Sequence, residues 1–207
     1  MTIYKNLEQG TEEWLQVRAG KITGSEIQPL ISVSKGTGKG GHINYCRKKA
    51  VEKLFGIETA TFKSGAMIQG TEREPYARMA YELLKGVSVE QVGFVELNEF
   101  VGCSPDGLIG EDGILEIKSK TDDGHAKLLL GEEDFESYYI WQALYVAYVC
   151  NRKWADLISF NPHYGKSSIF IKHLERTPET DAIIEKAIAI GTETINEYIN
   201  KLQKLIN

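Results

Sequence analysis

A short predicted β-hairpin near the middle of the chain constrains the fold more than any other segment. Leu108-Ile109 and Ile114-Leu115-Glu116-Ile117-Lys118 are rich in apolar residues, and Gly-Glu-Asp-Gly separates them, as is typical of two strands joined by a turn. Because side chains alternate between the faces of a strand, Glu116 and Lys118 share one face, and the apolar residues between them face the core. The hairpin therefore predicts a sheet that carries a charged pair on one face.

The rest of the chain predicts helices first, then a mixed sheet containing one helix, and finally a closing helix. Pro75 is expected to kink the long helix over 64–85 or to mark its true first turn, and Ser64 is the expected cap of this helix. The expected fold class is α/β (α+β), with a central mixed β-sheet flanked by helices in one domain over residues 1–207. Helices are expected over 11–18, just after 22–25, over 44–55 (closed by Gly56), over 64–85, within 132–150 and from 177 nearly to the end. Further strands are expected over 87–97, 154–160 and 168–174. A loop is expected over 32–42.

Composition excludes several classes of protein. Of the 207 residues, 42% are hydrophobic and 26% are charged, which is typical of globular proteins rather than disordered or fibrous ones. No apolar run approaches the ~20 residues of a membrane span, and no secretory signal is visible, so a cytoplasmic protein is expected. Cys46, Cys103 and Cys150 form no CxxC pair and are expected to be reduced thiols. The net charge of −5 argues against a protein that coats nucleic acid, but it does not exclude an enzyme acting on DNA.

The charged face of the hairpin has the composition of a site for phosphodiester hydrolysis. Asp106, in Ser104-Pro105-Asp106-Gly107, precedes the hairpin closely enough to bring its carboxylate beside Glu116. Two carboxylates repel each other, and a hard cation such as Mg²⁺ relieves this repulsion and takes oxygen ligands. The cation polarises a phosphate oxygen and lowers the pKa of bound water, and Lys118 can orient or deprotonate that water. The alternative is an exposed Glu–Lys pair without a catalytic role.

Two further motifs can contribute to this site. Glu74 lies about one helical turn after Gly70, which allows a close approach, so Glu74 is a candidate third carboxylate. The alternative is that Glu74 pairs with Arg73 or Arg78 on a solvated face. Gln142 is a polar side chain among the aromatic residues of an expected helix, and it can orient the nucleophile or the lysine of the hairpin. The tyrosines around it are expected to pack in the core.

Four segments, in this order along the chain, resemble one known family. They are residues 9–26 with their tryptophan, arginine and Ile-Thr-Gly-Ser signature, the Gly-x-x-x-Glu motif at 70–74, Ser-Pro-Asp-Gly followed by Leu-Glu-Ile-Lys, and the glutamine helix at 139–145. The pattern resembles the phage lambda exonuclease / YqaJ-type viral recombinase family of the PD-(D/E)xK nuclease superfamily. The resemblance covers nearly the whole chain.

The resemblance implies a restriction-endonuclease-like core and a role for each charged residue of the site. Asp106 and Glu116 are implied as metal ligands, assisted by the carbonyl of Ile117. Glu74 is implied as a ligand of a second metal ion or as a partner of the attacking water. Lys118 is implied as the catalytic lysine.

A pocket for the 5′ phosphate of the substrate strand is also implied, with Arg18, Ser25 and Ser104 as its residues. A guanidinium, hydroxyl groups and a helix N-terminus together bind a terminal phosphate well. Two features depart from the family pattern. Leu144 stands where the family's reference member has a second glutamine, which leaves the role of Gln142 open, and no proline closely follows the catalytic lysine.

The implied activity is a Mg²⁺-dependent exonuclease that degrades one strand of double-stranded DNA from its 5′ end. Mn²⁺ is expected to substitute, and two ions are expected in each active site. A homotrimeric ring acting on duplex ends is implied, together with a partner that anneals the 3′ single-stranded overhang during phage or prophage recombination in the cytoplasm of a bacterial host.

Two alternatives lie in other classes. One is a nuclease of the same fold with another substrate, such as an endonuclease or a single-strand-specific enzyme. The other is a non-catalytic DNA-binding relative. Dependence on DNA ends separates the first alternative from the exonuclease, and dependence on Mg²⁺ separates the second.

Overall fold

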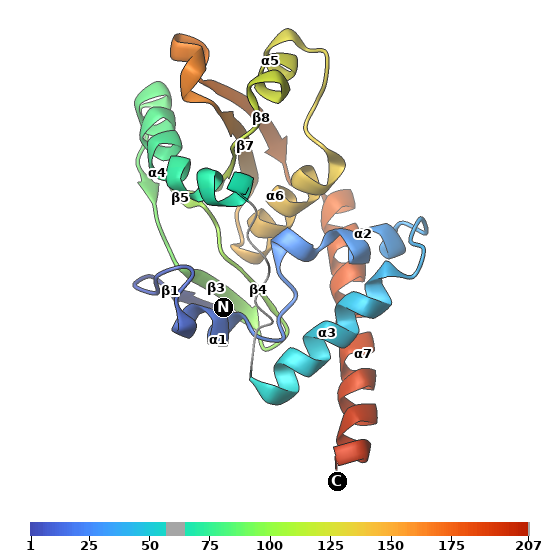
Figure 1. Cartoon of the computed structure of the whole chain (residues 1–207). Helices are drawn as coiled ribbons and strands as arrows, with labels where there is room; N and C mark the ends of the chain where they lie inside the picture. Colours follow the sequence, from blue (N-terminus) through green and yellow to red (C-terminus); the bar gives the residue numbers. More distant parts are fainter. Residues whose placement is uncertain (57–64, 207) are drawn as a thin grey trace.

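The computed structural model describes residues 1–56 and 65–206, and its centre is a five-stranded mixed sheet (Figure 1). The strands lie in the order β2-β5-β6-β7-β8, and all neighbours are antiparallel except β6 and β7, which are parallel. The predicted hairpin is formed by β5 and β6, and both of the later predicted strands, β7 and β8, are confirmed. The bounds are β2 (Val89–Glu90), β5 (Gly107–Ile109), β6 (Gly113–Lys118), β7 (Trp154–Phe160) and β8 (Ile169–Glu175).

A smaller antiparallel sheet, in the order β1-β3-β4, lies beside the central one. Its strands are β1 (Thr2–Tyr4), β3 (Phe94–Asn98) and β4 (Val101–Cys103). The prediction of one strand over 87–97 is therefore wrong, because β2 and β3 belong to different sheets. The chain crosses between them at Gly93, where a Cβ atom would lie 1.8 Å from the carbonyl oxygen of Leu7.

Helices cover both faces of the central sheet (Figure 1). On one face, α4 (Gly65–Lys85) packs Ala77 and Tyr81 against Leu115 and Ile117 of β6. On the opposite face, α6 (Ser137–Val149) lies across β6 and β7 and belongs to the larger core. The apolar residues of β6 are thus buried as predicted, and the strand is enclosed on both sides.

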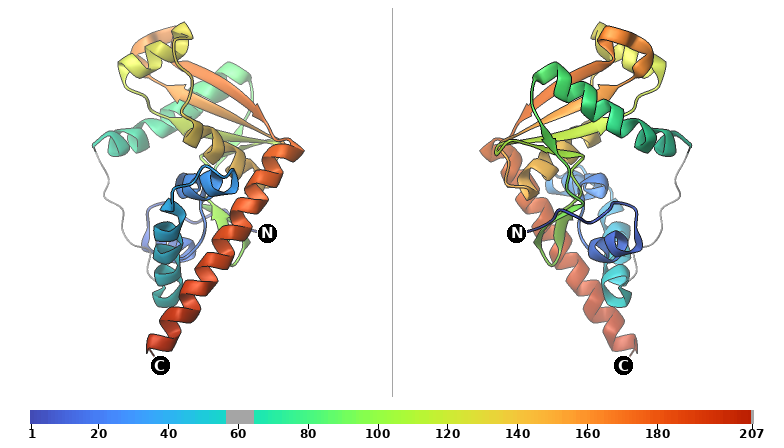
Figure 2. Two further views of the ribbon diagram at one scale, coloured as in Figure 1. Left: turned by 90° about the vertical axis from the view of Figure 1, so that its right-hand side faces the viewer. Right: turned by 90° about the vertical axis from the view of Figure 1, so that its left-hand side faces the viewer.

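A third layer of helices packs outside α6. It contains α2 (Gln28–Ser34), α3 (Gly41–Phe55) and the long α7 (Pro178–Ile206), which contact one another. Figure 2 shows α7 running along this layer, with the C-terminus at its far end. The N-terminal α1 (Glu12–Arg18) and the 3₁₀ turn η1 (Gly24–Glu26) lead into the layer, and η1 contacts α6.

Local signals in the sequence explain most of the helix ends. The side chain of Thr11 caps α1 by accepting a hydrogen bond from the backbone N–H of Trp14, and Gly56 ends α3 in a left-handed conformation. Pro75 lies inside α4 and not in its first turn. Ser64, the predicted cap of α4, lies outside the described residues.

Three expectations need correction. The predicted loop over 32–42 is shorter, because α2 continues to Ser34 and α3 begins at Gly41. The helix α5 (Asp122–Leu130) was not predicted, although Thr121 caps it by accepting from the backbone N–H of Gly124. The 3₁₀ segment η2 (Pro162–Ser167) connects β7 and β8, a connection in which no helical segment was expected.

The expected fold class, a mixed sheet flanked by helices, is confirmed, while a single domain over residues 1–207 stays a prediction. Within residues 1–56 and 65–206, no helix has both the length and the apolar character needed to cross a membrane.

The crossing at Gly93 generates a stability prediction. Gly93→Ala is expected to lower the free energy of unfolding by about 1–3 kcal/mol, because the new methyl group must displace the backbone at Leu7. Urea unfolding followed by circular dichroism measures the change. Gly41→Ala is the matched control, since a Cβ atom added there, in the first turn of α3, would meet nothing within 4 Å and stability should be unchanged or slightly higher. Equal stability of the two variants would contradict the close approach.

Candidate active site

The pairing of β5 with β6 brings the two candidate metal-ligating carboxylates together. Gly107 is paired with Leu115, so the same register sets Asp106 opposite Glu116 at the open end of the hairpin. The backbone N–H of Ile117 donates to Oδ2 of Asp106 at 2.6 Å and fixes this carboxylate against β6. The sequence predicted this proximity from the short connection alone, and the ladder of hydrogen bonds provides it.

Gln142 joins the two charged residues of β6. Its Nε2 donates to Oε1 of Glu116 at 2.6 Å, and its Oε1 accepts from Nζ of Lys118 at 3.2 Å. Nζ of Lys118 also donates to Oε1 of Glu116 at 2.8 Å. The three side chains thus form a closed triangle between β6 and α6, in which a single glutamine holds both ionic groups in position.

Tyr139, one turn before Gln142 on α6, adds an aromatic contact that the sequence did not assign. The Nζ atom of Lys118 lies 4.8 Å from the centre of the Tyr139 ring, a distance suited to a cation–π interaction. Tyr145, further along the same helix, packs in the core as predicted, whereas Tyr138 is exposed. The predicted packing role therefore holds for only part of this aromatic run.

The donor set fits a hard divalent cation. Glu116 is buried, and its Oε2 has no hydrogen-bond partner although its Oε1 accepts from two donors. An unpartnered carboxylate oxygen in a buried position is costly, and a cation between it and Asp106 would remove that cost. Among the described residues, no three acidic, histidine or cysteine side chains enclose such a position. A bound ion would therefore also need oxygen ligands from the backbone or from solvent.

The electrostatics of the site reflect crowded negative charge. Burial raises the pKa of Asp106 well above its ordinary value, and the neighbouring carboxylates of Glu116 and Glu74 raise it further. Burial acts to lower the pKa of Lys118, but attraction to Glu116 and Asp106 outweighs it, so the pKa of Lys118 lies above its ordinary value. Lys118 is consequently an ammonium group that can donate hydrogen bonds at neutral pH.

Glu74 approaches the site from α4 and is paired with Arg78. Nη2 of Arg78 lies 2.6 Å from Oε1 of Glu74, and Nε of Arg78 donates to the backbone carbonyl of Asp106 at 3.2 Å. Burial raises the pKa of Glu74, with a further contribution from Glu116, against the opposing effect of Arg78. The predicted ion pair exists, but it lies against the carboxylates of the hairpin and not on a solvated face, since Arg78 is buried. Arg78 was considered only as an ion-pair partner, and its link to Asp106 could not be seen in the sequence.

The residues proposed for a terminal phosphate are arranged around Trp14. The guanidinium carbon of Arg18 lies 4.4 Å from the centre of the Trp14 ring, and the indole N–H of Trp14 donates to Oγ of Ser104 at 2.9 Å. Ser104 is two residues from Asp106, so this cluster adjoins the carboxylate pair. Trp14 was recognised in the sequence only as part of a signature, and the structure gives it contacts with both polar residues.

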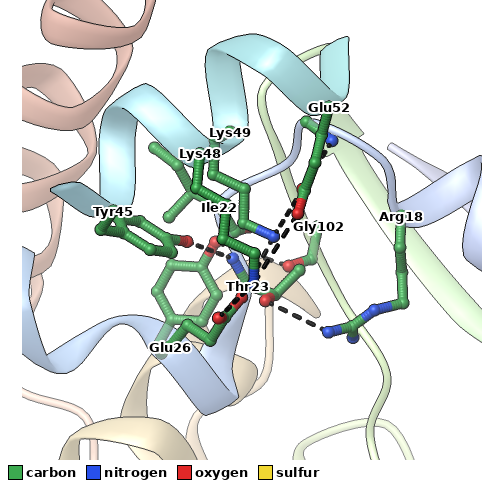
Figure 3. A network of polar contacts seen from close by, with 11 residues as sticks. Arg18, Ile22, Thr23, Glu26, Tyr45, Lys48, Lys49, Glu52 and Gly102 are labelled. Atoms are coloured by element: carbon green, nitrogen blue, oxygen red, sulfur yellow. Dashed lines mark hydrogen bonds and ion pairs between the residues drawn. The ribbon is translucent and has the colours of Figure 1, made fainter. Parts of the chain in front are cut away.

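Ser25 is exposed on η1, close to Thr23 and to the glutamine of α6. Nη2 of Arg18 lies 3.5 Å from Oγ1 of the buried Thr23, a weak contact shown in Figure 3. The turn η1 packs against α6 beside Gln142, because a Cβ atom at Gly24 would lie 3.0 Å from Cγ2 of Val146 and 3.4 Å from Cγ of Gln142. The two groups of candidate residues are therefore adjacent, and Thr23 is a hydroxyl that the sequence analysis did not single out.

Comparison with known families identifies the chain. Residues 13–153, more than half of the sequence, match the YqaJ-like viral recombinase domain. The chain belongs to this family. No curated protein matches the sequence. The family membership confirms the resemblance found from the four motifs.

Solved structures show the same architecture. The alkaline exonuclease LHK-Exo from Laribacter hongkongensis superimposes with a TM-score of 0.83 and 28% identity, over 95% of this chain and 98% of that chain. LHK-Exo in complex with dAMP gives a TM-score of 0.81 and 27% identity over the same shares. A phage-related exonuclease from Haemophilus somnus 129PT, 17% identical with a TM-score of 0.68 over 90% of this chain and 96% of that chain, shares the fold. The restriction-endonuclease-like fold is thereby confirmed.

The crowding of carboxylates generates a pH-dependent prediction. Since the pKa of Asp106 is raised in the folded protein, the unfolded chain ionises first as the pH rises above about 4, and the resulting loss of stability grows until the raised pKa is passed. The effect therefore fades as the pH falls toward about 4, the ordinary pKa of Asp. Asp106→Asn is therefore expected to raise the melting temperature by a few degrees at pH 8 and to have less effect as the pH falls. Scanning calorimetry without metal, from pH 8 to pH 4, measures this.

The change in melting temperature on addition of Mg²⁺ tests the candidate metal site. Binding to the folded state should raise the melting temperature of the wild type and not that of Asp106→Asn. Asp112→Asn, in the exposed turn of the hairpin, is the control and should respond like the wild type. A wild-type protein indifferent to Mg²⁺ would count against the metal site.

Proposed function

We propose that this protein is a metal-dependent exonuclease that degrades one strand of double-stranded DNA in the 5′-to-3′ direction. The observation that carries the proposal is the buried Glu116 carboxylate, which has one unpartnered oxygen, beside Asp106 and in contact with Lys118 and Gln142. The similarity to a solved alkaline exonuclease over nearly the whole chain supports the same activity.

Asp106 and Glu116 would hold Mg²⁺ or Mn²⁺, with the Ile117 carbonyl as a further ligand and Glu74 as the candidate ligand for a second ion. When bound, such ions polarise a phosphodiester oxygen and lower the pKa of water. Lys118, as an ammonium, donates hydrogen bonds to the phosphate or to the attacking water. Gln142 keeps that ammonium and the Glu116 carboxylate in a fixed relative position.

Strand polarity follows from the location of the proposed phosphate pocket. Arg18, Ser25 and Ser104 would bind the 5′ phosphate through charge-assisted hydrogen bonds. Ser104 is two residues from Asp106, and η1, which carries Ser25, packs against α6, which carries Gln142, so the bound 5′ end would lie next to the scissile bond. Degradation from the 5′ end leaves a 3′ single-stranded overhang.

The relative's ligand is consistent with this reaction. LHK-Exo was solved with dAMP, and a 5′-to-3′ exonuclease that starts from a 5′ phosphate would release nucleoside 5′-monophosphates of this kind. By the resemblance to the family, we also propose a homotrimer acting on duplex ends, a single-strand annealing partner in phage or prophage recombination, and a location in the cytoplasm of a bacterial host.

Digestion of a linear duplex labelled at the 3′ end of one strand tests the activity. The labelled strand is expected to shorten from its 5′ end only with a divalent cation, and Lys118→Ala is expected to slow this by about 10²-fold or more, because an ammonium that stabilises developing charge is lost. Lys127→Ala, at a partly exposed lysine paired with Asp123 and Glu133, is the control. Equal cutting of closed circular DNA would favour an endonuclease, and no cutting at all would favour a non-catalytic DNA-binding protein.

The phosphate pocket is tested separately by the chemistry of the DNA end. Wild-type protein is expected to degrade 5′-phosphorylated ends faster than 5′-hydroxyl ends, and Arg18→Gln is expected to reduce this preference by about tenfold, since a charged bidentate donor is replaced by a neutral one. The measurement is the ratio of initial rates on the two substrates. Arg152→Gln, whose guanidinium donates to the carbonyl of Gly110 on the hairpin, serves as control. An unchanged ratio in Arg18→Gln would remove Arg18 from the pocket.

A further inference from the structure

One face of α3 buries charged residues against the segment that carries the proposed phosphate pocket. The residues of this face follow helical spacing and point toward residues 18–26 (Figure 3); they are Tyr45, Lys48, Lys49 and Glu52. Lys49 and Glu52 are almost completely buried. Buried lysine is rare unless it is paired, so the contacts of Lys49 show what this face holds in position.

Lys49 bridges Glu26, at the end of that segment, and Glu52, one turn further along α3 itself. Its Nζ lies 2.9 Å from Oε2 of Glu52 and 3.1 Å from Oε2 of Glu26. Glu26 follows Ser25 directly and also pairs with Lys48 at 3.0 Å. Burial acts to raise the pKa of Glu26, but the two lysines outweigh it and hold the pKa below its ordinary value, so the carboxylate is ionised. The bridge is therefore ionic at neutral pH.

Each carboxylate fixes one side of the pocket. Oε2 of Glu52 accepts from the backbone N–H of Gly20 at 3.3 Å, two residues after Arg18. Glu26 fixes η1 from its last residue and thereby the position of Ser25. The arm that carries Arg18 and the arm that carries Ser25 are thus joined through the buried ammonium group of Lys49. The partly exposed Lys48 makes a second, longer link, since its Nζ lies 3.0 Å from Oε1 of Glu26 and 3.7 Å from Oε1 of Glu52.

The middle of the segment is held by neutral hydrogen bonds. The hydroxyl of Tyr45 accepts from the backbone N–H of Thr23 at 3.3 Å, and the hydroxyl of Tyr145 donates to the carbonyl of Ile22 at 2.7 Å. Two tyrosines therefore fix the centre, while its ends depend on charge. Apolar residues of similar volume could fill the space around Lys49 with equal or greater stability, so stability alone does not account for a buried ionic bridge.

We propose that Lys49 is a positioning residue that sets the spacing between the Arg18 arm and the Ser25 arm, and through it the selectivity for a 5′-phosphorylated end. The inference rests on the proposed phosphate pocket. Lys49 does not contact the phosphate in this arrangement, and it acts only through Glu52 and Glu26.

The test compares two DNA ends in two variants. Lys49→Met keeps the approximate length of the side chain and removes the buried bridge, so that only the longer link through Lys48 remains. Glu26→Gln, at a half-buried position, releases the Ser25 arm alone and leaves Lys49 paired with Glu52, so it remains informative if the first variant fails to fold. We expect each variant to lower the preference for 5′-phosphate over 5′-hydroxyl ends by about tenfold, because displacing a binding group by a fraction of an ångström to 1 Å has effects of this size or larger. Rates on 5′-hydroxyl ends should stay within about twofold of the wild type.

A matched control separates positioning from general loss of stability. Tyr81→Phe removes a buried hydrogen bond of 2.6 Å to Asp156 on the far face of the sheet. It should lower the melting temperature without changing the preference for phosphate. The inference is wrong if Lys49→Met and Glu26→Gln retain the wild-type preference for 5′-phosphate ends. It is also wrong if both variants lose rate equally on the two kinds of end, in proportion to their loss of stability.

A binding measurement distinguishes failure of the inference from failure of the proposed function. Fluorescence anisotropy with 5′-phosphorylated and 5′-hydroxyl duplexes, in EDTA, reports the pocket without catalysis. A wild-type preference that the Lys49 and Glu26 variants lose supports the inference even if no nuclease activity is found. If the wild-type protein binds both kinds of end equally, the proposed phosphate pocket is wrong, and so is the inference about Lys49. The proposed nuclease activity is then tested by the digestion experiment alone.

Discussion

The antiparallel register between β5 and β6 is the constraint on which the rest of the site depends. It sets Asp106 opposite Glu116, and the backbone N–H of Ile117 ties the two strands at that point. A slip of one residue would turn Glu116 and Lys118 toward α4 and bury their charges in the second core. The burial of Leu115 and Ile117 under α4 prevents this slip, so the packing of apolar residues on one face determines the chemistry on the other.

The site concentrates unfavourable electrostatics in a place where the surrounding structure is strong. Three carboxylates converge on the end of the hairpin, and only Lys118 and Arg78 oppose them among the groups described there. Such an arrangement is unstable by itself and persists because β6 is enclosed by helices on both faces. In the proposed enzyme, the same crowding would favour binding of a divalent cation, since a cation that neutralises the repulsion stabilises the folded state.

Much of this arrangement could be predicted from local sequence, and the exceptions have physical causes. Period-2 alternation located Glu116 and Lys118, and turn residues located the hairpin, because both signals lie within a few residues. The split of 87–97 could not be seen, because it depends on the distant contact between Gly93 and Leu7. Lys49 and Glu52 have a spacing and charge typical of a solvated helix face, and only the tertiary packing of α3 shows that they are buried.

The packing of η1 against α6 has a mechanical consequence for the proposed enzyme. Backbone packing fixes the distance between the pocket that would hold the end of the strand and the centre that would cut it. The length removed in each cycle is then a property of the protein scaffold rather than of the bases being removed. A Cβ atom at position 24 would lie 3.0 Å from Cγ2 of Val146, so a side chain there would press η1 away from α6 and change the distance between the pocket and the centre that cuts the strand.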